Sequence, residues 1–312
     1  MSSLGRALDK YLTIRRALGF ELRRTEWLLR RFVAFAEREG VHRITTDLAL
    51  RWATLPAHVQ GSERSVRLGV VRRFAEYLRT TDPRTEVPPV NLLPSIKVRR
   101  PQPYIYSDDE ILRLIRAARA LPSPTGLRAW TYATLLGLLA VTGLRHSEAL
   151  ALNRGDVDLD AGVLTVRRSK CRKARLVPVH TTTCEQLERY ARRRDRVHRT
   201  PRSDAFLVSE RGLRLVQASV QHTFVVVSRQ IGLRVPARSH GHGPRLHDLR
   251  HRLAVTTLMR WYRAGVDVDA KLPVLATYLG HTKVSDTYWY LSAVPELMHL
   301  AMARLDRKVR MP

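Results

Sequence analysis

The first 80 residues carry apolar side chains at helical spacing. Between residues 24 and 37, Trp27 and other large apolar residues recur near the 3.6-residue period, with arginine and glutamate between them. A second helix is expected after Thr46, and a third over residues 65–78. Since no stretch alternates convincingly like a strand, this region predicts a small bundle of about four helices.

A different pattern begins at Ser107, where the string S-D-D-E is typical of a capping box that starts a helix. Residues 127–142 are almost continuously apolar, which predicts a buried helix ending at Gly143. Residues 163–179 predict two short strands around a basic turn. Further helices are expected at about 216–231, 247–264, 271–279 and 284–308.

The two patterns are separated by a segment rich in proline. Residues 82–103 contain six prolines in 22 residues, which removes backbone donors and predicts an extended linker. The segment also carries Lys97, Arg99 and Arg100, which suit a strap laid along a phosphate backbone.

The charge of the chain indicates a polyanionic partner. Lysine and arginine number 55 against 28 acidic residues, giving a net charge of +27 and a pI near 11.3. A GC-rich genome would favour arginine over lysine but would not create this excess. Nucleic acid is the main interpretation, and an anionic membrane surface or the ribosome is the alternative. The arginine run at 192–202 is interpreted as a solvated helix end, with DNA contact as its alternative.

Other sequence features bear on compartment and cofactors. No apolar stretch approaches the roughly 20 residues of a transmembrane helix, and the amino terminus lacks a signal-peptide core, so a cytoplasmic protein is expected. Cys171 and Cys184 cannot form a disulfide framework and do not form a C-x-x-C pair. His240, His242, His247 and His251 could suggest a metal cluster, but no carboxylate or cysteine completes a ligand set. No metal and no cofactor are therefore predicted.

Three short strings carry the candidate chemistry. They are T-G-L-R-H-S-E at 142–148, H-D-L-R-H at 247–251, and L-G-H at 279–281, which Tyr290 follows nine residues later. In this order and spacing the chain resembles the tyrosine recombinase (phage integrase) family over essentially its whole length. The residues after Tyr290 depart from the family's usual pattern. The extended aromatic motif resembles that of recombinases from transposons and other mobile elements.

The resemblance implies a fold and a domain organisation. The expected fold is mainly α with a small antiparallel sheet or hairpin in the catalytic domain, forming a two-domain, C-shaped DNA clamp. The implied domains are a helical, SAM-like core-binding domain at 1–82, a basic linker at 83–104, and a catalytic domain with a C-terminal helix at 105–312.

Arginines suit the transfer of a phosphoryl group because negative charge accumulates on its non-bridging oxygens. Arg145 follows a helix stop and Arg250 lies one turn beyond His247, and each planar guanidinium can hold two phosphate oxygens. Ordinary surface arginines are the alternative. By resemblance, Glu148 orients Arg145, although it could simply be a carboxylate at a helix start.

The remaining roles come from the same resemblance. His247 would bind the phosphate and is a candidate acceptor for the nucleophile's proton, while His281 would contact a non-bridging oxygen. Lys170, in the turn of the hairpin, would be the general acid that protonates the departing 5′ oxygen. Arg172, Lys173 and Arg175 are close enough to compete with it, and Lys173 is the rival.

Tyr290 is the predicted nucleophile, and Tyr288 is the neighbour that competes for the role. On a helix the two side chains point roughly 160° apart, so only one can face the site. Thr287 precedes Tyr290 by three residues and matches the family's T-x-x-Y pattern, which assigns Tyr288 and Trp289 to packing. The segment at 295–308 is expected to pack on its own domain or to dock on a neighbouring subunit.

The resemblance implies an enzyme, a site-specific DNA recombinase that works through a 3′-phosphotyrosyl intermediate and a Holliday junction without ATP or metal. Expected partners are double-stranded DNA with inverted repeats, a homotetramer on two sites with a dimer on each, and other recombinases. A bacterial, nucleoid-associated location follows. The alternatives are a type IB-like topoisomerase and an inactive DNA-binding accessory protein. Candidate DNA contacts, for which solvated side chains are the alternative, are Arg24, Arg64, Arg67, Arg72, Lys97, Arg99, Arg100, Arg172 and Lys173.

Overall fold

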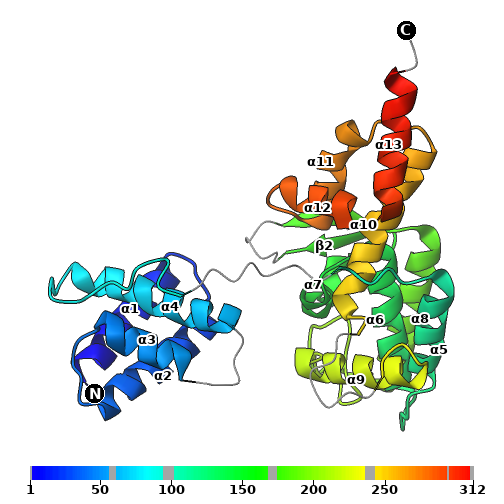
Figure 1. Cartoon of the computed structure of the whole chain (residues 1–312). Coiled ribbons are helices and arrows are strands. Elements are labelled where there is room, and N and C mark those ends of the chain that lie inside the picture. The colour runs from blue at the N-terminus through cyan, green and yellow to red at the C-terminus, as the bar shows by residue number, and fades with distance from the viewer. Residues whose placement is uncertain are drawn as a thin grey trace. The chain divides into compact units, whose positions relative to one another are not determined.

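The computed structural model describes residues 2–55, 61–93, 102–167, 174–235, 243–293 and 295–309. The chain divides into two compact units, Met1–Arg100 and Pro101–Pro312. Each unit has a hydrophobic core of its own, and Figure 1 shows the helices and strands that build it.

Helices build the first unit: α1 (Ser3–Ala17), α2 (Arg23–Arg38), α3 (Thr46–Thr54) and α4 (Gly61–Arg79). Their apolar faces bury Leu28, Phe32 and Trp52, and each such side chain stabilises the fold by about 2 kcal/mol. The prediction of about four helices is confirmed, and the described residues of this unit form no strand. Trp27 lies outside the core: it is 53% exposed, with the Arg31 guanidinium over its ring.

Part of the proline-rich segment packs on the first unit. The Glu86 carboxylate accepts from the Thr46 amide at the start of α3, over 2.8 Å, and the Glu86 amide donates to the Ile44 carbonyl oxygen. Val87 and Leu93 contact the apolar cluster of this unit. Residues up to 93 therefore continue the first unit, whereas Lys97, Arg99 and Arg100 lie outside the described residues.

The second unit is a mainly helical body with one small sheet. Its elements are α5 (Asp108–Arg119), α6 (Leu127–Thr142), α7 (His146–Ala151), the short 3-10 helix η1 (Arg154–Asp156), β1 (Val157–Asp158), β2 (Val163–Val166), β3 (Arg175–Pro178), α8 (Thr181–Val197), α9 (Gln217–Gln230), α10 (Leu246–Arg263), α11 (Val268–Leu279), α12 (Ser285–Ala293) and α13 (Pro295–Val309).

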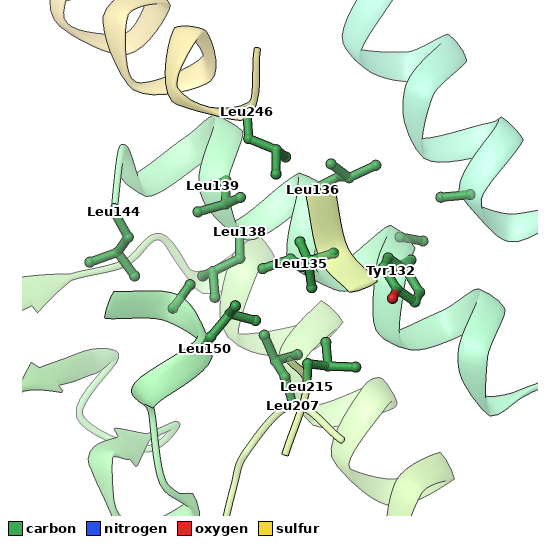
Figure 2. Packing of buried hydrophobic residues seen from close by; sticks show 14 of the residues in the cluster. Tyr132, Leu135, Leu136, Leu138, Leu139, Leu144, Leu150, Leu207, Leu215 and Leu246 are labelled. Carbon is green, nitrogen blue, oxygen red and sulfur yellow. The ribbon is translucent and has the colours of Figure 1, made fainter. Parts of the chain in front are cut away.

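Local signals set the ends of the first helices of this unit. Ser107 and Glu110 form the predicted capping box at the start of α5. Helix α6 is buried, as predicted, and ends where Gly143 adopts φ +60°. Leu135 and Leu139 of α6 share one cluster with Leu246 of α10 (Figure 2). Every helix among the described residues is too short or too polar to span a bilayer.

The sheet is antiparallel, with strand order β1-β2-β3. Val163 pairs with Pro178 and Val166 with Arg175, so β2 and β3 form the predicted hairpin. The short strand β1 was not predicted, since two residues carry no pattern of alternation. The mainly α fold with a small antiparallel sheet is confirmed. The turn that holds Lys170 lies outside the described residues.

Helices α10 to α13 enclose a second apolar cluster, and they gather at one end of the unit in Figure 1. The expectation of one helix over 284–308 is wrong, because a new helix begins at Pro295. Proline suits the first turn of a helix and disrupts an interior position. Leu297 is fully buried and Arg263 pairs with Glu296 over 2.5 Å, so α13 packs on its own unit.

The arginine run at 192–202 contains a correction. Arg194 is 4% exposed, donates to the Phe206 carbonyl oxygen over 2.9 Å, and places its guanidinium 5.1 Å from the Phe206 ring centre. It is therefore a core side chain and is not solvated, because α8 packs this face on the loop that holds Phe206.

Candidate active site

Glu148 holds Arg145 at the start of α7. Gly143 reverses the chain after α6, and α7 begins at His146, so the two residues lie one turn apart. The Arg145 amide donates to Glu148 Oε2 over 3.0 Å, and Arg145 Nη1 donates to Oε1 over 2.7 Å. Glu148 is 3% exposed, so a buried carboxylate holds the Arg145 guanidinium in place.

Arg175 is a second partner of this carboxylate. From the start of β3 its Nη1 and Nη2 donate to Glu148 Oε1 and Oε2 over 3.0 and 2.8 Å. Burial disfavours charge on Glu148, but hydrogen bonds from Arg175 and Arg145 outweigh it and lower its pKa to about 2. Sequence reasoning treated Arg175 only as a neighbour of the lysines, and the hairpin register was the one signal that could have placed it here.

The carboxyl end of α11 accepts from three arginines in succession. The carbonyl oxygens of residues 278, 279 and 280 accept from Arg175 Nε, Arg250 Nη2 and Arg145 Nη2 over 2.9, 2.6 and 3.0 Å. A helix ends with unpaired carbonyls and partial negative charge, which favours cations there. Gly280, at φ +69°, lets the chain approach: a Cβ at this position would lie 2.6 Å from Arg175 Nη1.

Arg250 is the most deeply buried of these cations. It is 2% exposed and also donates from Nη1 to the Gly143 carbonyl oxygen over 2.8 Å. Burial and repulsion from Arg145 lower its pKa to about 10, while the Tyr290 phenol acts to raise it. Arg250 therefore stays charged at neutral pH, close enough to Arg145 and Tyr290 to interact with both.

His281 lies against the helix that carries the predicted nucleophile. Its Nδ1 is 2.7 Å from Oγ1 of Thr287, which is fully buried, so the threonine of T-x-x-Y positions the histidine. The His281 ring stacks on the Tyr290 ring at 6.1 Å and 20°. Burial and the charges of Arg250 and Arg145 lower the pKa of His281 to about 4, so its ring is neutral at pH 7.

Tyr290 and Tyr288 point in opposite directions, as helix geometry predicts. Tyr290 is 2% exposed and faces the arginines and histidines, whereas Tyr288 is 46% exposed. The assignment of Tyr288 to packing is therefore wrong, because the outer face of α12 stays open. Trp289 does pack, on the cluster of α10 to α13.

His251 is the histidine that lies beside the phenol. Its Nδ1 is 3.2 Å from Tyr290 Oη, and the residue is 8% exposed. His247 is exposed, and its ring meets the His251 ring edge-on at 4.6 Å. Sequence reasoning considered His251 only as a metal ligand; its place after Arg250 on α10 was the available signal.

Several predicted residues lie outside the described part of the chain: Lys170, Arg172, Lys173, Cys171, His240, His242, Lys97, Arg99 and Arg100. Among the residues that are described, no three or more histidine, cysteine or acidic side chains gather as metal ligands would. Cys184 is a free thiol.

The arginines of the first unit differ in their surroundings. Arg67 is a core residue, since it is 7% exposed, donates to the Trp52 carbonyl oxygen over 2.7 Å and covers the Trp52 ring at 3.8 Å. Its proposed contact with DNA is therefore wrong. Arg24 is exposed and pairs with Glu63, and Arg72 is half-buried. Arg64 is likewise half-buried, and these three remain predicted contacts.

Comparison with known proteins identifies the family. The phage integrase family matches residues 105–296. "Putative integrase/recombinase y4rB" of Sinorhizobium fredii is 48% identical over 99% of this chain and 98% of its own. Tyrosine recombinase XerD of Neisseria meningitidis is 31% identical over 75% of this chain and 74% of its own.

Solved structures share the fold. The Tn1549 transposon integrase in complex with transposon right end DNA has a TM-score of 0.63 and 14% identity, over 96% of this chain and 99% of its own. XerH site-specific recombinase bound to palindromic difH substrate has a TM-score of 0.61 and 16% identity, over 91% and 77%. With this fold, the three strings in place and close relatives along its whole length, the chain belongs to the phage integrase family of tyrosine recombinases.

Proposed function

We propose that this chain is a site-specific DNA recombinase whose nucleophile is Tyr290. The observation that carries the proposal is the surroundings of its buried phenol, whose ring stacks on His281 and whose hydroxyl lies at hydrogen-bonding distance from His251, the residue that follows Arg250 on α10. A buried tyrosine beside cations and neutral histidines suits attack on a phosphodiester better than it suits packing alone.

In the proposed reaction, Tyr290 Oη bonds to the scissile phosphorus as the bond from phosphorus to the 5′ oxygen breaks. A free phenol, with a pKa of roughly 10, attacks poorly, so the charge that develops on the phosphate oxygens must be stabilised. Arg145 and Arg250 are suited to this because the α11 carbonyls and Glu148 already fix their guanidiniums. By family resemblance Lys170 protonates the leaving oxygen, and Lys173 is its rival.

The product would be a 3′-phosphotyrosyl link and a free 5′-hydroxyl. A 5′-hydroxyl from a partner duplex would then attack the link through a Holliday junction, so neither ATP nor a metal takes part. A homotetramer on two inverted-repeat sites fits this exchange, with other recombinases as candidate partners. Lambda integrase, a solved relative in fold, forms a tetramer bound to a Holliday junction. Such a substrate would place the protein with the bacterial nucleoid in the cytoplasm.

The domain roles belong to the same proposal. The helical first unit would bind the core of the site, the basic end of the linker with Lys97, Arg99 and Arg100 would follow the phosphate backbone, and residues 105–312 would carry the chemistry. Together the two domains would close on the duplex as a clamp. The residues predicted to contact DNA, other than Arg67, would bind its phosphates.

Covalent trapping tests the proposal. DNA protected by Tyr290→Phe protein is sequenced, and a duplex nicked near the cut site is built from it. Wild-type protein and Tyr288→Phe should form the covalent adduct, and Tyr290→Phe should bind without forming one. An adduct that survives in Tyr290→Phe and disappears in Tyr288→Phe would move the role to Tyr288. Equimolar recombinants from a two-site plasmid would distinguish strand exchange from relaxation by a topoisomerase.

A further inference from the structure

The phenol of Tyr290 has a histidine partner outside the residues that the family resemblance assigns. His251 Nδ1 lies 3.2 Å from Tyr290 Oη, and both side chains are buried. Their rings meet at 5.4 Å and 61°, and the Trp289 ring lies 5.3 Å from the His251 ring. Packing therefore holds the imidazole against the hydroxyl that would react.

A buried carboxylate stands behind this histidine. His251 Nε2 is 4.0 Å from Oδ1 of Asp248, one turn earlier on α10, and Asp248 is 1% exposed. Arg245 fixes the carboxylate, since its amide and its Nη2 each donate to it over 2.8 Å. The negative charge favours a proton on Nε2, which leaves Nδ1 as the acceptor of the phenol hydrogen. Nucleophile, base and orienting carboxylate in sequence are the arrangement that activates hydroxyl nucleophiles.

Burial, assisted by the neighbouring cations, keeps His251 unprotonated before DNA binds. Burial lowers its pKa to about 4; Asp248 opposes this, and Arg245, Arg250 and His281 add to it. The His247 and Tyr290 rings also lie against it. A phosphate bound by Arg145 and Arg250 would cancel part of the positive field. The proton affinity of His251 would therefore rise when the phenol has to lose its proton.

We propose that His251 is a catalytic residue that accepts the proton of Tyr290 during DNA cleavage, with Asp248 as its positioning residue. The proposal rests on the proposed function. The proton passes from Oη to Nδ1 as Oη bonds to phosphorus, and the 5′ oxygen leaves with a proton from the general acid. In the second step the attacking 5′-hydroxyl returns a proton to the general acid, and the released phenolate recovers its own from His251.

Two variants separate proton transfer from simple orientation. His251→Asn places an amide oxygen near the position of Nδ1, so it still accepts the phenol hydrogen bond but cannot take the proton. His251→Gln removes that acceptor. Both should slow adduct formation on the nicked duplex by about 10²-fold, the usual contribution of a general base, and bind DNA as wild type does. His222→Gln, an exposed histidine on α9, is the matched control and should keep the wild-type rate.

A more acidic nucleophile provides the decisive readout. Fluorotyrosine, incorporated only at position 290, loses its proton more readily than tyrosine does. In the His251→Asn background it should therefore raise the rate of adduct formation at least about tenfold. It should change the rate of the wild-type background by much less. Rescue of this kind is not expected if His251 only supports packing.

Each outcome decides the matter. A wild-type rate in His251→Asn, or a loss that fluorotyrosine does not reduce, overturns the proposal for His251 while Tyr290 keeps its role. If His251→Asn and His251→Gln do not fold, the same comparison is made with Asp248→Asn, for which a loss of about tenfold that fluorotyrosine reduces is expected. Wild-type protein that never forms an adduct overturns the proposed function and this inference with it.

Discussion

Arg250 donates to the carbonyl oxygen of Leu279 over 2.6 Å, and both residues are buried. The contact joins the H-D-L-R-H string on α10 to the L-G-H string at the end of α11. Arg175 and Arg145 donate to the carbonyls on either side of Leu279, so displacement of this helix end would move three guanidiniums together. The arginines are thus arranged by backbone carbonyls as well as by Glu148.

Gly280→Ala should disrupt this arrangement. The new methyl group would lie 2.6 Å from Arg175 Nη1, and the residue would keep φ +69°, which costs about 1 kcal/mol for a non-glycine residue. Because displacement of the guanidiniums misplaces the phosphate, adduct formation should fall about 10²-fold while DNA binding changes little. Covalent trapping and a binding titration measure the two effects.

Gly265→Ala is the matched control for that substitution. Gly265 has φ +70°, but a Cβ there meets no atom within 4 Å. It carries the backbone cost without the collision, so it should lower the melting temperature and leave cleavage unchanged. Equal loss of cleavage in the two alanine variants would contradict the role given to the end of α11.

Glu148→Gln should weaken both stability and cleavage. The glutamine keeps the shape but removes the negative charge between Arg145 and Arg175, and breaking a buried ion pair typically costs about 3 kcal/mol. With Arg145 less well held, adduct formation should fall about 10²-fold. Urea unfolding and covalent trapping measure these effects. Glu188→Gln, which breaks an exposed pair with Arg192, should change neither one.

Local signals made much of this fold predictable. The capping box at Ser107, the helix stop at Gly143 and the hairpin over 163–179 each depend on neighbours in sequence, and each is confirmed. The strings that hold Arg145, Arg250 and Tyr290 indicated the site for the same reason. The split at Pro295 is also a local signal, because proline suits the first turn of a helix.

The contacts that the sequence did not predict join residues that are distant along the chain. Arg175 meets Glu148 across 27 positions, and His251 meets Tyr290 across 39. In a chain with 55 basic residues, composition makes every arginine look like a DNA contact. Arg67 and Arg194 are buried because aromatic rings and backbone carbonyls face them, which no spacing in the sequence reveals.

Arg67→Ala should therefore act on folding and not on DNA. The substitution removes a buried hydrogen bond and a guanidinium from the Trp52 ring, so the first unit should lose roughly 1–3 kcal/mol. The dependence of DNA affinity on salt should stay as in wild type. Arg24→Ala, at an exposed predicted contact, should instead reduce the slope by about 0.9 log units per log of salt. A weaker dependence of DNA affinity on salt in Arg67→Ala would instead show that Arg67 contacts a phosphate.

Acidification below about pH 6.5 should destabilise the second unit through its buried histidines. Burial lowers the pKa of His251 to about 4, against roughly 6.5 in an unfolded chain. Between these values the unfolded chain binds a proton that the folded chain does not, so the free energy of unfolding falls as pH drops from about 6.5 to about 4. For His251 the loss is on the order of 2–3 kcal/mol, and His281 contributes in the same direction.

His251→Asn isolates that contribution. The variant has no proton to take up at position 251, so its unfolding free energy should depend less steeply on pH across this window, whatever its stability at pH 7. Urea titrations in half-unit pH steps measure the slope, with the exposed His222→Asn as the control that keeps it. Glu148 does not confuse the result: its pKa of about 2 means that its stabilisation is lost only as pH falls from about 4.5 toward 2. Identical slopes in wild type and His251→Asn would mean that the surroundings do not lower the pKa of this imidazole. The proposed base would then not be kept in its neutral form by burial.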